Sequence, residues 1–244
     1  MKKIPELTAL FWITKICATT LGETAGDLFS MTLNIGYAVS SIMFITFFFI
    51  LVTIQLSVKK YIPVIYWFVI LATSTAGTTL SDYMDRTLGL GYAMGSLLLV
   101  SLLLMTLFIW QHTQKSLSVA NIQSPKAELF YWTAILFSNT LGTALGDYLA
   151  DDSGLGFGGS ALLIGCVLAV LLLLHYFSKV SAVFLFWVAF ILTRPFGATF
   201  GDLLTKSLAK GGLGYGTKGA TLILFSMLLI LIIYEMRAKR ILKK

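Results

Sequence analysis

The chain has 244 residues, of which 57% are hydrophobic and 12% are charged, and its mean hydropathy is +0.88. That composition excludes an ordinary soluble domain, because too little polar side chain is present to cover a solvated surface. The formal net charge of +7 would suit a nucleic-acid partner, but the basic residues are placed in a pattern that indicates membrane topology. The sequence therefore predicts an integral membrane protein in contact with a lipid bilayer.

Eight apolar segments follow one another along the chain, each about 20 residues long and therefore long enough to cross a bilayer. They lie near residues 7–28, 37–58, 62–83, 92–112, 127–149, 157–178, 181–204 and 214–235. The alternation of a membrane barrel is absent, and backbone polar groups in lipid must be satisfied within the protein. We expect an all-α integral membrane protein with eight transmembrane helices.

Basic residues gather at the chain ends and in the loops after the even-numbered segments. They are Lys2, Lys3, Lys59, Lys60, Lys115, Lys126, Lys179, Arg237, Lys239, Arg240, Lys243 and Lys244. The opposite loops hold only Arg86, Lys206 and Lys210, beside several aspartates. By the positive-inside rule, both termini are expected in the cytoplasm. The basic excess thus indicates topology in a cytoplasmic membrane, and no nucleic-acid partner is expected.

One sequence frame, W-x9-G-x4-D, occurs four times. Its copies are Trp12-Gly22-Asp27, Trp67-Gly77-Asp82, Trp132-Gly142-Asp147 and Trp187-Gly197-Asp202. The repeats that contain it extend over approximately residues 6–61, 62–118, 127–180 and 181–236. We therefore expect residues 1–244 to form a single transmembrane domain built from one repeated unit.

A glycine followed by an aromatic residue stands nine residues beyond each of the first three aspartates and twelve beyond the fourth. These pairs are Gly36-Tyr37, Gly91-Tyr92, Gly156-Phe157 and Gly214-Tyr215. Each repeat is thus predicted to be a helix, an external turn and a returning helix. Because such a unit begins and ends on one side, the four hairpins are parallel and related by an axis along the membrane normal. A ring with pseudo-fourfold symmetry and a two-plus-two packing both satisfy this prediction.

This layout resembles the bacterial membrane-anchored proteins that are built from four tandem copies of a two-helix repeat of unknown function, each with a characteristic tryptophan. The resemblance covers essentially the whole chain, through the four frames quoted above. It implies the architecture and a bacterial inner membrane. It carries over no catalytic role and no substrate.

Small residues four apart precede each aspartate. The pairs are Gly22 and Gly26, Gly77 and Ser81, Gly142 and Gly146, and Gly197 and Gly201. Residues at this spacing lie on one face of a helix and let neighbouring helices approach closely. The odd-numbered helices are therefore expected to form a tight inner layer.

The four aspartates follow that small face near the external ends of their segments. One interpretation is structural, with each carboxylate capping an external turn or bonding a neighbouring repeat. The other is that a symmetric fold gathers like charges, which a cation, a proton or basic partners must offset. Asp27, Asp82, Asp147 and Asp202, together with Glu23, are therefore candidate cation and metal ligands.

Four charged residues break the repeat: Glu23, Lys15, Arg194 and Lys218. The three bases are the expected charge partners of the acids. Glu23 and Arg194 differ by one helical turn in repeat register, and in a ring the first and fourth repeats are neighbours, so we predict an ion pair between them. Five acids against three bases leave two negative charges, which suits one dication or two protons.

Carboxylates surrounded by threonine hydroxyls are hard oxygen ligands, which favour Mg²⁺, Mn²⁺, Ca²⁺ or Na⁺ over soft metals. A bound divalent cation would be a substrate, and no resident cofactor is expected. The tryptophans of the frame are interpreted as membrane anchors in an aromatic belt near the cytoplasmic side, or as packing residues. They are Trp12, Trp67, Trp132 and Trp187.

Three functions are compatible with these observations. The first is a secondary transporter or exporter of a hard inorganic cation such as Mn²⁺, with protons as a counter-ion. The second is a passive ion channel, or a carrier of an anionic or organic solute, which Arg194 and Lys218 favour. The third is a membrane scaffold with structural aspartates. An enzyme is not expected, because the sequence shows no constellation of nucleophile and base.

Overall fold

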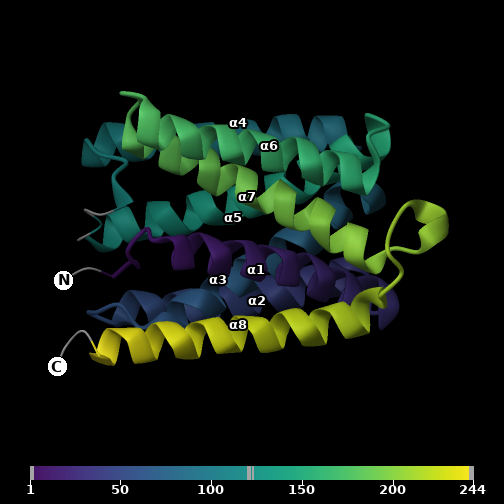
Figure 1. Ribbon diagram of the computed structural model, residues 1–244, viewed down its shortest axis with the longest axis horizontal. Helices are drawn as coiled ribbons and strands as arrows, with labels where there is room; N and C mark the ends of the chain where they lie inside the picture. Colours follow the sequence, from purple (N-terminus) through teal and green to yellow (C-terminus); the bar gives the residue numbers. More distant parts are fainter. Residues whose placement is uncertain (1–2, 120–121, 123, 242–244) are drawn as a thin grey trace.

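The computed structural model describes residues 3–119, 122 and 124–241, and all regular structure in these residues is helical (Figure 1). The long helices are α1 (Ala9–Asp27), α2 (Tyr37–Ser57), α3 (Pro63–Asp82), α4 (Tyr92–Gln114), α5 (Pro125–Asp147), α6 (Gly156–Phe177), α7 (Ala182–Thr205) and α8 (Gly216–Ile241). Six of them, all except α1 and α5, are long and apolar enough to cross a membrane. These two are less apolar because α1 carries Lys15, Glu23 and Asp27, and α5 carries Lys126, Glu128 and Asp147.

Local sequence signals set where several helices begin. The Thr8 hydroxyl accepts a hydrogen bond from the Phe11 amide at 3.4 Å, and the Ser124 hydroxyl accepts one from the Ala127 amide at 3.1 Å. These are N-cap contacts, which satisfy backbone donors that the first helical turn leaves free. Gly36 precedes α2 with a φ of 84°, a conformation that a side chain disfavours. The predicted glycine turn is thus confirmed there.

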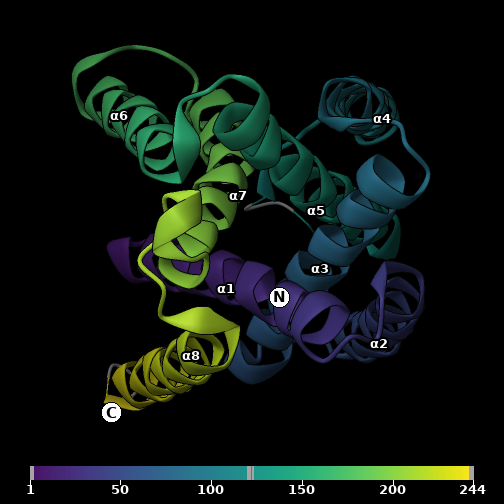
Figure 2. The same ribbon diagram turned by 90° about the vertical axis from the view of Figure 1, so that its right-hand side faces the viewer.

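The inner layer is a closed ring of α1, α3, α5 and α7. Each packs against the next in this order, and α7 packs back against α1 (Figure 2). The prediction that the odd-numbered helices form the inner layer is confirmed. The arrangement is the ring with pseudo-fourfold order, and the two-plus-two alternative is wrong, because all four neighbouring contacts are made.

Each outer helix covers the inner helix of the following repeat. Helix α2 packs on α3, α4 on α5, α6 on α7, and α8 closes the series on α1 (Figure 2). The outward faces of these helices are apolar, as the large exposed fractions of Phe108 (71%), Leu162 (70%) and Ile223 (69%) show. A lipid environment suits such a surface. The interlocked order joins the four repeats into a single unit.

Small residues make the inner ring tight, as predicted. A side chain at Gly22 would overlap Ser74, and one at Gly142 would overlap Arg194. A Cβ at Gly77 would lie 2.8 Å from the backbone carbon of Asn139. The remaining glycines of the small faces lie against the neighbouring inner helix in the same way: Gly26, Gly146, Gly197 and Gly201. Close approach therefore brings the polar residues of neighbouring helices into direct contact.

Three of the four inner helices end at the aspartate and continue into one wide turn. These turns are η1 (Leu28–Thr32), η2 (Tyr83–Thr87) and η4 (Tyr148–Asp152). Each is π-helical, with bonds such as Leu33 N to Leu28 O at 2.8 Å. The fourth repeat differs, because α7 runs on to Thr205 and is followed by the short 3₁₀ turn η5 (Leu208–Lys210).

Candidate functional site

The inner faces of the four central helices form a buried column of side chains, here called the axial column. On each helix its members are spaced four residues apart, so equivalent residues of the four repeats form layers. The first layer lies at the end where α1 begins, and the last layer holds the four aspartates. In this order the layers are Phe11, Tyr66, Tyr131 and Phe186; Lys15, Ile70, Ile135 and Phe190; Thr19, Ser74, Asn139 and Arg194; Glu23, Thr78, Thr143 and Ala198; and Asp27, Asp82, Asp147 and Asp202. All twenty are at most 6% exposed. The column therefore changes from aromatic to acidic along its length.

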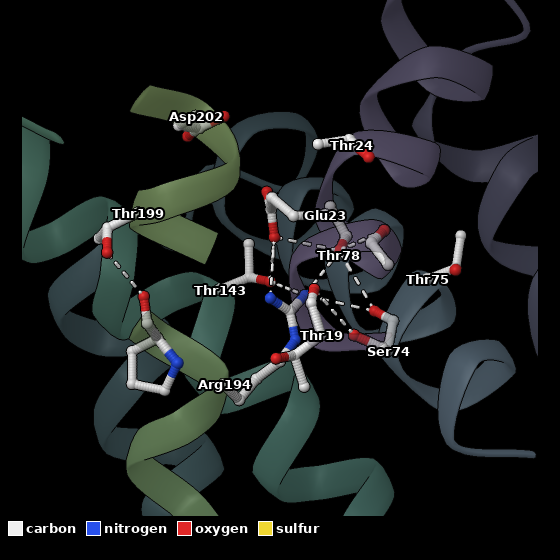
Figure 3. Close-up of polar contacts among 12 residues, drawn as sticks. Thr19, Glu23, Thr24, Ser74, Thr75, Thr78, Thr143, Arg194, Thr199 and Asp202 are labelled. Atoms are coloured by element: carbon white, nitrogen blue, oxygen red, sulfur yellow. Dashed lines mark hydrogen bonds and ion pairs between the residues drawn. The ribbon is translucent and has the colours of Figure 1, made fainter. Parts of the chain in front are cut away.

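Glu23 and Arg194 form an ion pair in the middle of the column (Figure 3). Nη1 of Arg194 lies 3.0 Å from Oε2 of Glu23, and the two residues are 0% and 2% exposed. The predicted pair between the first and fourth repeats is confirmed. The two side chains meet because α7 packs back against α1 and closes the ring.

Hydroxyl groups from the second and third repeats add hydrogen bonds to this pair (Figure 3). Nη2 of Arg194 donates to Oγ1 of Thr78 at 2.6 Å and to Oγ1 of Thr143 at 2.7 Å. Both threonine hydroxyls also lie within hydrogen-bonding distance of Oε2 of Glu23, at 3.2 and 3.3 Å. All four inner helices thus meet at one buried ion pair, and a buried charged pair needs such hydrogen bonds to be tolerated.

The four aspartates form one layer, in which two basic residues each bridge a pair. Nζ of Lys206 lies 2.6 Å from Oδ2 of Asp27 and 3.1 Å from Oδ1 of Asp202. Across the ring, Arg86 holds Asp82 through Nε at 2.9 Å and Asp147 through Nη2 at 3.1 Å. Basic partners from the chain itself therefore offset the like charges.

Burial lowers the pKa of Lys206, but the carboxylates of Asp202 and Asp27 raise it more, so the pKa lies above its usual range. The ammonium group is charged at neutral pH as a result. Its side chain is 18% exposed, whereas both aspartates below it are nearly inaccessible. Lys206 thus forms the outer cover of this half of the aspartate layer.

Three carboxylates meet beneath Lys206. Glu23, Asp27 and Asp202 each offer one ligand atom, and these atoms lie within 4.8 Å of one another. Glu23 reaches this group from the layer below, where Arg194 and the two threonines fix one of its oxygens. We call these three residues the carboxylate triad. Its oxygen atoms are the ligands that hard cations prefer.

Two of the three expected charge partners are wrong. Lys15 is fully buried, but its Nζ has no hydrogen-bond partner and lies 3.9 Å from the centre of the Phe190 ring. Lys218 is exposed in the first turn of α8, and among the described residues it forms no ion pair with an acid. Lys15 therefore contacts an aromatic face instead of a carboxylate, and Lys218 lies outside the column.

The true partners of the aspartates, Arg86 and Lys206, were assigned to external loops by the charge pattern. A usable signal was present, because each stands four residues after its own aspartate, the spacing that brings side chains together on a helix. The first and third repeats carry Met31 and Asp151 at this position. A basic residue thus stands at this position only in the second and fourth repeats. This alternation indicates that each basic residue serves two aspartates, which divides the four aspartates of the ring into two pairs.

The interpretation of the frame tryptophans as membrane anchors is wrong for three of them. Trp67 and Trp132 are each 1% exposed and Trp187 is 4% exposed, so they belong to the core, and only Trp12 remains partly accessible. The indole of Trp67 donates to Glu235 at 2.9 Å. Packing between the inner ring and the outer helices buries these rings, which an amphipathic anchor would leave at the interface.

Ion pairs and hydrogen bonds also close the end of the column opposite the aspartates. The hydroxyls of Tyr66 and Tyr131 lie 2.6 Å apart. Lys3 reaches back over this end to the buried Glu128 at 2.6 Å and to the carbonyl oxygen of Leu56 at 3.0 Å. Aromatic rings thus fill this end of the column, and Lys3 ties the segment before α1 to α2 and α5.

The chain matches a family described as a Repeat of Unknown Function (DUF347), over residues 10–61, 65–116, 130–181 and 185–240. Four tandem matches cover most of the sequence, and the chain belongs to this family. The expected family resemblance is thereby confirmed. No curated protein and no solved structure matches the chain.

Proposed function

We propose that this member of the DUF347 family is a secondary transporter of a hard inorganic cation, such as Mn²⁺, in a bacterial inner membrane. It crosses the bilayer eight times with both termini in the cytoplasm. The basic residues after the even-numbered helices support this orientation through the positive-inside rule. Figure 1 is compatible with it, because α1 begins and α8 ends at the same end of the molecule.

The carboxylate triad carries the proposal. Ionisable groups inside a membrane protein are costly, and they mark ion pathways more often than they serve packing. Glu23, Asp27 and Asp202 converge at the outer end of a polar column, where a cation can enter past the partly exposed Lys206. A divalent ion held by three carboxylates and retained water has the oxygen coordination that Mn²⁺ or Mg²⁺ prefers.

The charge balance is compatible with a proton as the counter-ion. The column holds five carboxyl groups, namely Glu23 and the four aspartates, and four bases lie in it or over it: Lys15, Arg86, Arg194 and Lys206. The formal difference is one negative charge, which is smaller than the two expected from the sequence because Arg86 and Lys206 are included and Lys218 is not. One proton or one further cation charge therefore balances the column.

A second candidate function is a membrane scaffold in which the aspartates are structural. The observation that favours it is that Arg86 and Lys206 between them contact all four aspartates. In that case the ion pairs hold the external ends of the four repeats together. A closed column of packed side chains favours both a carrier and a scaffold over a passive channel.

The test compares two double variants of the purified protein in detergent. Asp27→Asn/Asp202→Asn removes two members of the triad, and Asp82→Asn/Asp147→Asn makes the same chemical change on the opposite side. A ligand that binds only the folded state stabilises it by about 2.7 kcal/mol at a hundredfold excess over Kd. We expect Mn²⁺, Mg²⁺, Ca²⁺ or Na⁺ to raise the thermal stability of the wild type and of the second variant, but not of the first.

Flux of the identified ion into proteoliposomes then separates carrier from scaffold. A transporter gives saturable flux that depends on a proton gradient and is lost in Asp27→Asn/Asp202→Asn. Absence of any ion-dependent shift in a well-folded wild type, with equal destabilisation of the two double variants, would identify the aspartates as scaffold residues and refute the proposal.

A further inference from the structure

Lys206 has a position that its equivalents in the other repeats do not share. It is the first residue beyond α7, and its ammonium group lies on two of the three triad carboxylates, Asp27 and Asp202. Oδ1 of Asp202 is buried, and the ammonium group of Lys206 lies 3.1 Å from it. A cationic group of the chain itself is thus already bound at two of the three acids.

The ammonium group of Lys206 holds its two aspartates less rigidly than the guanidinium group of Arg86 holds the other two. Arg86 uses two different nitrogens for its two aspartates, whereas Lys206 serves both of its aspartates with the single Nζ. A guanidinium matches carboxylates with a rigid fork of donors, while an ammonium acts as a compact point charge on a flexible stem. An incoming metal cation can replace a point charge without rebuilding the site.

The backbone around Lys206 is fixed, so only its side chain is free to leave. Its amide donates to the carbonyl of Asp202 at 2.9 Å, and its carbonyl accepts from Gly214 at 2.8 Å. Gly212 lies so close to the Lys206 carbonyl that a side chain there would overlap it. Rotation of the partly exposed lysine side chain toward solvent therefore opens the triad without unfolding the turn.

We propose that Lys206 is a tethered cation that occupies the carboxylate triad, and that a divalent cation binds there only by displacing it. The inference rests on the proposed function and adds a built-in competitor to that site. While the lysine is seated, external cations are excluded and the acids are neutralised. When the lysine swings out, Glu23, Asp27 and Asp202 become available together.

The experiment measures Mn²⁺ binding by calorimetry to the wild type, to Lys206→Gln and to Arg86→Gln. The apparent Kd of a site equals its intrinsic Kd divided by the fraction that is open. If the lysine occupies the triad for about nine-tenths of the time, its removal lowers the apparent Kd about tenfold. Arg86→Gln is the matched control, because it removes the same charge from the other aspartate pair, and its Kd is expected to stay within about twofold of wild type.

Equal Kd values in Lys206→Gln and wild type would overturn the inference even if the wild type transports Mn²⁺. Tighter binding by Lys206→Gln in a protein that shows no flux would refute the transport proposal and leave the tethered cation standing. Absence of Mn²⁺ binding in all three proteins overturns both. If Lys206→Gln does not fold, Lys206→Arg replaces it: a two-nitrogen clamp on Asp27 and Asp202 is expected to weaken Mn²⁺ binding at least threefold, and an unchanged Kd overturns the inference.

Discussion

The two sides of the inner ring share a backbone plan but differ in chemistry. On the side of α1 and α7, the first and fourth repeats supply the central charges Lys15, Glu23 and Arg194. On the side of α3 and α5, the equivalent positions carry isoleucines in place of Lys15, threonines in place of Glu23, and a serine and an asparagine in place of Arg194. The repeated frame therefore builds the scaffold, and the departures from it concentrate where the last repeat closes on the first.

The difference also explains why the ion pair is tolerated. Thr78 and Thr143, on the side of α3 and α5 (the hydroxyl side), donate hydrogen bonds to Glu23 and accept hydrogen bonds from Arg194. A buried ion pair gains stability only when its remaining donors and acceptors are satisfied. The charged side thus depends on the hydroxyl side, and substitutions on the two sides are expected to have unequal effects.

The largest expected effect comes from breaking the central ion pair. Arg194→Met leaves the Glu23 carboxylate buried without a counter-ion, and we expect a loss of about 3–5 kcal/mol in the free energy of unfolding. The double variant Glu23→Gln/Arg194→Met removes both charges and should recover most of that loss. Chemical unfolding in mixed micelles measures both. A double variant that is as unstable as Arg194→Met would show that the two charges are not coupled.

A smaller effect tests the close packing between the two sides. Gly77→Ala places a methyl group 2.8 Å from the Asn139 backbone, so we expect a loss of about 1–3 kcal/mol through overpacking. At Gly146 the same methyl group would meet the Cβ of Ala198 at 3.1 Å, which a small shift relieves. Thermal unfolding of Gly146→Ala is therefore the matched comparison, with an expected loss below about 1 kcal/mol. Equal losses would contradict a backbone contact that is specific to Gly77.

The sequence predicts the parts of this structure that depend on repetition and helical spacing. The frame predicts four equivalent two-helix repeats, the glycines predict the tight inner layer, and repeat register predicts the pair of Glu23 and Arg194. It does not predict that each outer helix covers the following repeat, because a helix that is apolar on every side has no face that indicates its partner. That packing is what buries Trp67 and the other frame tryptophans.

The charge partners could not be assigned for a related reason. Lys15 and Lys218 interrupt the repeat in the same way as Arg194, but only the ring geometry shows that Lys15 meets an aromatic ring and that Lys218 faces outward. Arg86 and Lys206 lie beyond the aspartates, in segments whose continued helical turn the apolar pattern does not reveal. Only their spacing from the aspartates indicates contact.

The smallest expected effect concerns Lys15, the one charged residue of the column that lacks a polar partner for its terminal group in the described structure. The second and third repeats have Ile70 and Ile135 at its position, and both are fully buried. Lys15→Met keeps the length of the side chain but removes an amine that no acceptor compensates, and it gives up a cation–π contact worth up to about 2 kcal/mol. Replacing a buried charge by a well-packed apolar group is often neutral or stabilising. We therefore expect a free energy of unfolding equal to wild type or higher by about 1 kcal/mol, and a change within about 0.5 kcal/mol for the exposed control Lys218→Met. If the free energy of unfolding falls by more than about 1 kcal/mol in Lys15→Met alone, the amine stabilises the side of α1 and α7. The asymmetry between the two sides of the ring would then extend to the layer of Lys15, one layer below Arg194.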